Sequence, residues 1–136
     1  MDDYVAIVTN DVIRHSLPGM EFIRDTRPVT DYTFAINYAI SGINQVSFHV
    51  GNLIVHLGTA LLLYGVARRT FQTSRLGESP QSASRLAFVI AVLWVVHPLT
   101  TQAVTYIVQR GESLMSFFYL ATLYCCLLYT SPSPRD

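Results

Sequence analysis

The stretch VSFHVGNLIVHLGTALLLYGVA, residues 46–67, runs for 22 residues without a formal charge when histidine is neutral. At 1.5 Å per residue, a helix of this length crosses a hydrocarbon core of about 30 Å. His49, Asn52, His56 and Thr59 recur at helical spacing within an arc of roughly 80°. Because polar side chains in a membrane face protein or water, we expect other helices to pack on this stripe. Interhelical hydrogen bonding suits it, and a metal site or proton path is the alternative.

The composition is that of a membrane protein. Hydrophobic residues make up 51% of the 136 residues and charged residues 13%, whereas soluble domains carry about 25% charged residues. This balance excludes an ordinary soluble domain and a disordered chain. Nine arginines, without any lysine, balance nine acids, so no basic field attracts nucleic acid. The two cysteines, Cys125 and Cys126, are adjacent and provide neither a zinc-type spacing nor a framework of bridges.

The polar residues before the quoted stretch, 1–45, are expected to form an extracytoplasmic loop with one short helix. Large apolar residues alternate with smaller ones from Tyr32 to Ile40, which alone would indicate a strand. A single strand beside lipid would leave its backbone unpaired, however. Pro28 is typical of a helix start and Ser41-Gly42 of a helix end. We therefore predict an interfacial helix with its tyrosines at headgroup level.

The distribution of arginine sets the predicted orientation. The loop at 68–85 holds four arginines and one acid, whereas residues 1–45 hold three arginines and six acids. Because cytoplasmic loops carry the excess of basic residues, we predict 68–85 to be cytoplasmic and 1–45 to lie outside. A secretory signal would begin with basic residues followed by an apolar segment, whereas this sequence begins with the acids Asp2 and Asp3. The chain therefore either inserts through an internal segment or lacks its true beginning.

The remaining sequence predicts two further membrane segments. Residues 86–108 are long enough to span, with a bend at Pro98, which a membrane tolerates where the freed backbone is buried or lines a polar cavity. Residues 109–112 are expected to form an outer turn, and 113–125 to begin a last, truncated transmembrane helix. The tail at 126–136, CLLYTSPSPRD, resembles the translated read-through of a sequencing adapter. We expect no native structure or function for it, and a Ser/Pro linker is the alternative.

The predicted fold class is therefore all-α. We expect a fragment of a polytopic, integral membrane protein, with an outer loop, a short interfacial helix and about three transmembrane helices.

Two carboxylates and one arginine of the outer loop are candidates for chemistry. Asp2 and Asp3 could supply a general base for a hydroxyl nucleophile, and a solvated acidic terminus is the alternative. Arg27, which precedes Pro28, could hold a phosphate through its forked guanidinium, and an interfacial anchor is the alternative.

Three later residues are also candidates. His97 could place an imidazole in a polar cavity, and a helix end is the alternative. Arg110 and Glu112 could form a functional pair, and an ordinary surface pair is the alternative. We predict no metal site from these residues.

The order of these features carries more information than any one of them. Five segments carry a resemblance to one family: residues 2–8, residues 27–38, FHVGNLIVH at 48–56, HPLTTQAV at 97–104 and QRGESL at 109–114. In this order they resemble the bacterial relatives of the transmembrane and TPR repeat-containing O-mannosyltransferases, which belong to the GT-C class of membrane glycosyltransferases. The resemblance covers nearly all of residues 1–125.

The resemblance implies an activity and a set of site residues. Such enzymes transfer a sugar, here expected to be mannose, from a polyprenyl-phosphate donor to a protein hydroxyl outside the membrane, with no further cofactor. The catalytic diacidic motif maps to Asp2 and Asp3, and the substrate-binding and donor-phosphate positions map to Arg27, His97, Arg110 and Glu112. Relatives often have Asp at the position of Glu112.

The resemblance also implies what surrounds this segment. A first membrane helix, later helices and TPR repeats that recruit the protein acceptor are absent from the sequence, and a bacterial inner membrane is the expected location. A non-catalytic membrane scaffold is the alternative function, because it needs the same apolar spans.

Overall fold

The computed structural model describes residues 28–42, 44–73 and 79–130, and all regular structure among them is helical. In chain order, the elements are α3 (Pro28–Ser41), α4 (Gln45–Thr73), α5 (Pro80–Val96), α6 (Pro98–Thr105), the short 3₁₀ helix η2 (Ile107–Gln109) and α7 (Arg110–Thr130). Two helices are long and apolar enough to cross a membrane, over Gln45–Gln72 and Arg110–Thr130, and α5 is a shorter apolar helix. The all-α prediction is confirmed for this part of the chain.

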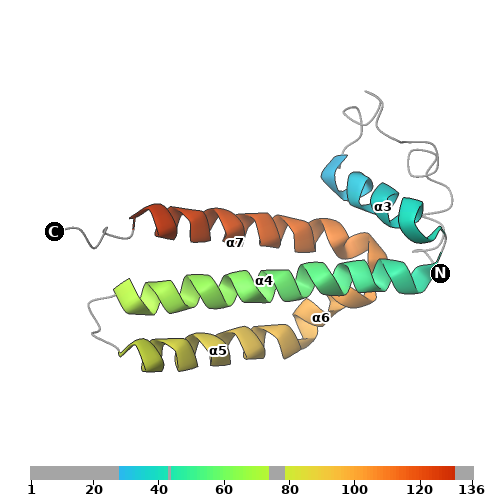
Figure 1. Cartoon of the computed structure of the whole chain (residues 1–136). Coiled ribbons are helices and arrows are strands. Elements are labelled where there is room, and N and C mark those ends of the chain that lie inside the picture. Colours follow the sequence, from blue (N-terminus) through green and yellow to red (C-terminus); the bar gives the residue numbers. More distant parts are fainter. Residues whose placement is uncertain (1–27, 43, 74–78, 131–136) are drawn as a thin grey trace.

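Helix α4 lies between α5 and α7, with α5 antiparallel to it and α7 parallel to it (Figure 1). The helix α3 packs on the ends of α4 and α7 at which both helices begin. It starts at Pro28 and ends at Ser41, and Gly42 follows with a φ of 61°. That left-handed conformation favours glycine, which explains why the helix ends here. The predicted short helix in the first 45 residues is thus present.

Helices α4 and α7 share a heptad register. Three glycines of α4 are spaced seven residues apart. Each of them packs against a large side chain of α7, and these three side chains are also spaced seven residues apart. A Cβ on each glycine would meet the α7 atom at 2.8 Å for Gly51 and Arg110, at 3.0 Å for Gly58 and Phe117, and at 2.9 Å for Gly65 and Tyr124. A seven-residue repeat keeps one helix face turned to its partner, so the two parallel helices stay in contact along their length.

The predicted break at Pro98 is present. Helix α5 ends at Val96, and His97 adopts an extended conformation before α6 begins at Pro98. Trp94 O accepts a hydrogen bond from Thr100 Oγ1 at 2.6 Å. The proline has no N–H and cannot continue the ladder, and a side chain supplies the missing donor.

Several predicted boundaries are wrong in the described residues. Helix α4 continues to Thr73, beyond the predicted end at Ala67, because arginine is a good helix former and its charge can reach water. Helix α5 begins at Pro80, inside the predicted loop 68–85, because Ser79 Oγ caps it by accepting from Ser82 N at 3.2 Å.

The last helix also differs from the prediction. The structure has no turn at 109–112, because η2 leads directly into α7 at Arg110. Helix α7 then runs beyond residue 125 to Thr130, so residues 126–130 of the expected unstructured tail are helical. These residues are apolar or neutral and contain no proline, and Pro132 comes only afterwards. Residues 131–136 lie outside the described part of the chain.

Candidate functional site

Arg110 lies at the junction of three helices with 1% of its surface exposed. Its Nε donates to Asn52 Oδ1 at 2.6 Å, and its Nη2 donates to Phe48 O at 2.7 Å. Its Nη1 donates to Thr33 O at 3.4 Å, and the guanidinium lies 4.4 Å from the centre of the Phe34 ring. Burial of a charge is costly unless its donors are satisfied, and here protein oxygens and an aromatic face surround it. The side chain therefore joins α3, α4 and α7.

The polar stripe of α4 faces the breaks in the neighbouring segment. His56 Nε2 donates to Val95 O at 3.4 Å, and His49 Nδ1 donates to Val104 O at 3.2 Å. Asn52 Nδ2 donates to Tyr106 O at 3.3 Å. Each of these carbonyls lies at the end of α5 or α6, where the helical ladder stops.

This arrangement settles the local role of the stripe. Carbonyls freed by a helix break need donors, and α4 supplies them to Val104 O from His49 and to Val95 O from His56. Tyr106 O accepts from Asn52 Nδ2 and also from Gln109 N at 3.2 Å. The fourth member, Thr59, donates to Val55 O within α4 at 2.8 Å. The predicted interhelical hydrogen bonding is thus confirmed. Among the described residues, no group of three or more His, Cys, Asp and Glu side chains is placed to hold a metal.

Glu112 borders two hollows and is exposed. One hollow, of about 160 Å³, is lined by residues of α4, α5, α6 and α7, namely His56, Thr59, Trp94, Leu99, Thr100, Glu112, Ser113 and Ser116. The other, of about 420 Å³, lies between α3 and α7 and includes Pro28 and Met115. A carboxylate between two open spaces can accept hydrogen bonds from a hydroxyl-bearing ligand in either of them.

The smaller hollow combines an aromatic wall with polar groups. The Trp94 and His56 rings are stacked with centres 4.8 Å apart. Ser113 Oγ is buried and makes no hydrogen bond to any residue in the described part of the chain. Neither Trp94 nor Ser113 was singled out in the sequence, because a lone aromatic and a lone serine on apolar helices carry no spacing signal. Only the packing of the four helices shows that Trp94 and Ser113 line this hollow.

The predicted site residues fall into two groups. His97, Arg110 and Glu112 lie in the described residues, on elements that pack together. His97 is exposed, and its Nδ1 accepts from Leu99 N at 3.3 Å, so it caps α6. Arg110 is buried and Glu112 is exposed, so they are not an ordinary surface pair. Asp2, Asp3 and Arg27 lie outside the described residues.

The chain is similar over most of its length to curated proteins named protein O-mannosyl-transferases. TMTC4 of Homo sapiens is 33% identical, and the match covers 91% of this chain and 20% of that protein. F38B6.6 of Caenorhabditis elegans is 31% identical, and the match covers 90% of this chain and 17% of that protein. Tmtc3 of Drosophila melanogaster is 36% identical, and the match covers 70% of this chain and 11% of that protein. The chain thus spans a fifth or less of these relatives. No family model and no solved structure matches it.

Proposed function

Because this chain is homologous, over most of its length, to one segment of the TMTC protein O-mannosyl-transferases, we propose that it is a segment of a membrane glycosyltransferase. The observation that carries the proposal is this similarity across about nine-tenths of the chain. The proposed reaction transfers mannose from a polyprenyl-phosphate donor to a hydroxyl of a protein. The proposed location is a membrane crossed several times, with the α3 end of the bundle on the outer side.

The transfer needs a base and a group that stabilises the leaving phosphate. The acceptor oxygen forms a bond to the anomeric carbon while the bond from that carbon to the phosphate oxygen breaks. The phosphate leaves with the electron pair, and the hydroxyl proton passes to a carboxylate. We assign the carboxylate to Asp2, with Asp3 as the alternate. A guanidinium suits the phosphate because it never deprotonates, and Arg27 is assigned this role.

The described residues supply the surroundings of that reaction. Glu112, exposed between two hollows, is assigned to substrate hydroxyls, and His97, exposed at the start of α6, to a substrate oxygen. Arg110 is the alternative to Arg27 as the group that stabilises the phosphate. Its three hydrogen bonds to protein oxygens support a positioning role instead, in which it fixes α3, the helix that begins at Pro28, against α4 and α7.

Sugar transfer in membranes tests the proposal. The complete gene product that contains this segment is assayed with D2N and D3N variants, and D11N serves as a control acid from the same segment. Loss of the base is expected to lower turnover by roughly 10²–10⁴-fold while donor binding survives. Parent-like transfer by both D2N and D3N would refute the assignment, and no transfer by the parent protein would favour a scaffold.

A further inference from the structure

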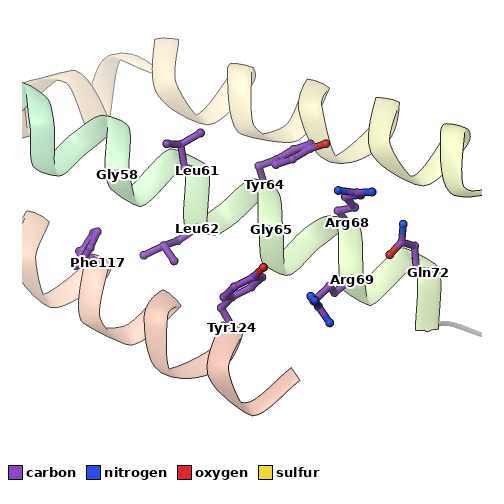
Figure 2. Close-up of a pocket in the computed structure, with 10 residues that line it drawn as sticks. All are labelled: Gly58, Leu61, Leu62, Tyr64, Gly65, Arg68, Arg69, Gln72, Phe117 and Tyr124. Atoms are coloured by element: carbon purple, nitrogen blue, oxygen red, sulfur yellow. The ribbon is translucent and has the colours of Figure 1, made fainter. Parts of the chain in front are cut away.

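A larger cleft lies between α4 and α7 and extends toward the end of α4 that is opposite to Glu112 (Figure 2). It has a volume of about 550 Å³. Its walls change character along its length. The part nearer the middle of α4 is apolar, with Leu61, Leu62 and Phe117, and the part nearer the end of α4 carries Arg68, Arg69 and Gln72. An occupant that fits both parts must be amphiphilic.

The polar end of the cleft is cationic. Arg69 is partly buried, with its guanidinium 5.5 Å from the centre of the Tyr124 ring, and Arg68 is exposed. Among the described residues, the only acids are Asp31 in α3 and Glu112 at the start of α7, and both belong to the opposite end of the bundle. The sequence from 68 to 85 carries four arginines and one acid. An anion is therefore the complementary ligand.

The depth of the cleft matches one leaflet of a bilayer. From Gly58 to Gln72 the lining follows α4 over a separation of fourteen residue steps, which is about 21 Å along the helix. Half of a bilayer, with its headgroup region, measures roughly 20–22 Å. The arginines stand at the end of this length, where headgroups lie, and the leucines stand where acyl chains lie.

The cleft also adjoins an entirely apolar hollow between α4 and α5. This hollow has a volume of about 460 Å³ and shares Leu61 and Tyr64 with the cleft. Two apolar spaces that meet beside one cationic end suit a ligand with two acyl chains and one anionic headgroup.

We propose that this cleft binds one anionic phospholipid from the leaflet at the arginine end of the bundle. The phosphate lies between Arg68 and Arg69, within reach of Gln72, and one acyl chain follows Leu62 toward Phe117. The site differs from the proposed sugar-transfer site in its end of the bundle and in its residues, so either proposal can fail without the other.

Lipid retention by the 136-residue chain tests this proposal. The chain is purified in mild detergent, loaded with phosphatidylglycerol or phosphatidylcholine, and analysed by native mass spectrometry for the number of lipids retained. The decisive variant is R68Q/R69Q. The matched control is R85Q, which removes an exposed arginine from α5 that does not line the cleft. R68K/R69K keeps the charge, and far-UV circular dichroism checks that all variants remain helical.

We expect one phosphatidylglycerol per chain for the parent, R85Q and R68K/R69K, and about 30-fold weaker binding for R68Q/R69Q. That factor corresponds to about 1 kcal/mol for each arginine near an anionic headgroup. Inorganic phosphate at the same concentration is not expected to compete, because it lacks the apolar part. Equal retention of phosphatidylcholine, equal loss in R85Q, or displacement by phosphate would overturn the proposal.

Discussion

The guanidinium of Arg110 occupies space that the absent side chain of Gly51 leaves open. A Cβ on Gly51 would stand 2.8 Å from Arg110 Nη2 and 3.1 Å from Asn37 Nδ2. The same pair begins the heptad register in which Gly58 receives Phe117 and Gly65 receives Tyr124. The packing of α4 on α7 and the position of the buried arginine are therefore set by one constraint.

Replacing Gly51 by alanine is expected to destabilise the bundle. The added methyl group displaces the guanidinium, and the hydrogen bond from Nη2 to Phe48 O is weakened or lost. Loss of a hydrogen bond to a charged group costs about 1.5–3 kcal/mol. Unfolding of G51A in mixed micelles measures the cost, with V50A as the control because Val50 is exposed on the same helix. An unchanged unfolding midpoint for G51A would contradict the packing described here.

The Arg110–Asn52 hydrogen bond is expected to appear as a coupling energy. R110M, N52L and the double variant form a cycle in which each single change removes one hydrogen bond from the other, buried side chain. The two costs should not add, and a coupling of about 1.5–3 kcal/mol is expected for a charged, buried pair. The free energies of unfolding of the four proteins give this number. Additivity within about 0.5 kcal/mol would show that the contact contributes little.

The sequence contained enough to predict the helices and the break between them. An uncharged stretch of 22 residues, a proline and a glycine after a serine are local signals, and α4, the break at His97 and the end of α3 follow from them. The helical spacing of the polar stripe, His49, Asn52, His56 and Thr59, is also a local signal, and it predicted which face of α4 packs against other helices. The helix boundaries are less predictable, because Arg68 and Arg69 after an uncharged stretch indicate a helix end, although arginine readily continues a helix.

The heptad register was missed although its signal is present. The spacing of seven between the glycines at 51, 58 and 65 acquires meaning only beside a second set of residues at 110, 117 and 124. Nothing local indicates that two helices separated by α5 and α6 pack in parallel. The candidate site has the same limit, because the hollow beside Glu112 combines side chains from four helices.

Trp94 provides a direct probe of the α4–α5 contact, because it is the only tryptophan of the chain. Its ring stacks on His56, which also donates to Val95 O. H56F keeps an aromatic neighbour and loses the hydrogen bond, at an expected cost of about 0.6 kcal/mol. H56L loses both, with about 0.5–1.5 kcal/mol more. Trp94 emission should shift more in H56L than in H56F, and identical spectra for the parent and H56L would argue against the stacking.

Cysteine accessibility tests the orientation that the arginines predict. In a background with Cys125 and Cys126 replaced by serine, a cysteine at position 77, between α4 and α5, should resist an impermeant reagent in intact cells. The matched control is Y106C, because Tyr106 is exposed near the other end of the bundle, and this cysteine should react. Labelling at 77 without labelling at 106 would invert the topology, and the proposed outer site would then be on the wrong side of the membrane.

The last prediction concerns Glu112 in the complete gene product. Its carboxylate is exposed between two hollows, one of which contains the stacked Trp94 and His56 rings and the unsatisfied Ser113 Oγ. If a substrate hydroxyl donates to this carboxylate, E112Q replaces a charge-assisted acceptor by a neutral one. Such bonds are worth about 1.5–3 kcal/mol, so kcat/KM should fall by roughly 10–150-fold.

The conservative variant separates this role from a structural one. E112D keeps the charge and should retain activity within a few-fold, whereas E112Q, with nearly the same volume, should not. Because binding of the substrate rather than proton transfer is affected, KM should rise in E112Q while kcat changes little. Equal activity of E112Q and the parent would remove Glu112 from the site. A fall in kcat alone would instead make Glu112, and not Asp2, the candidate for the base.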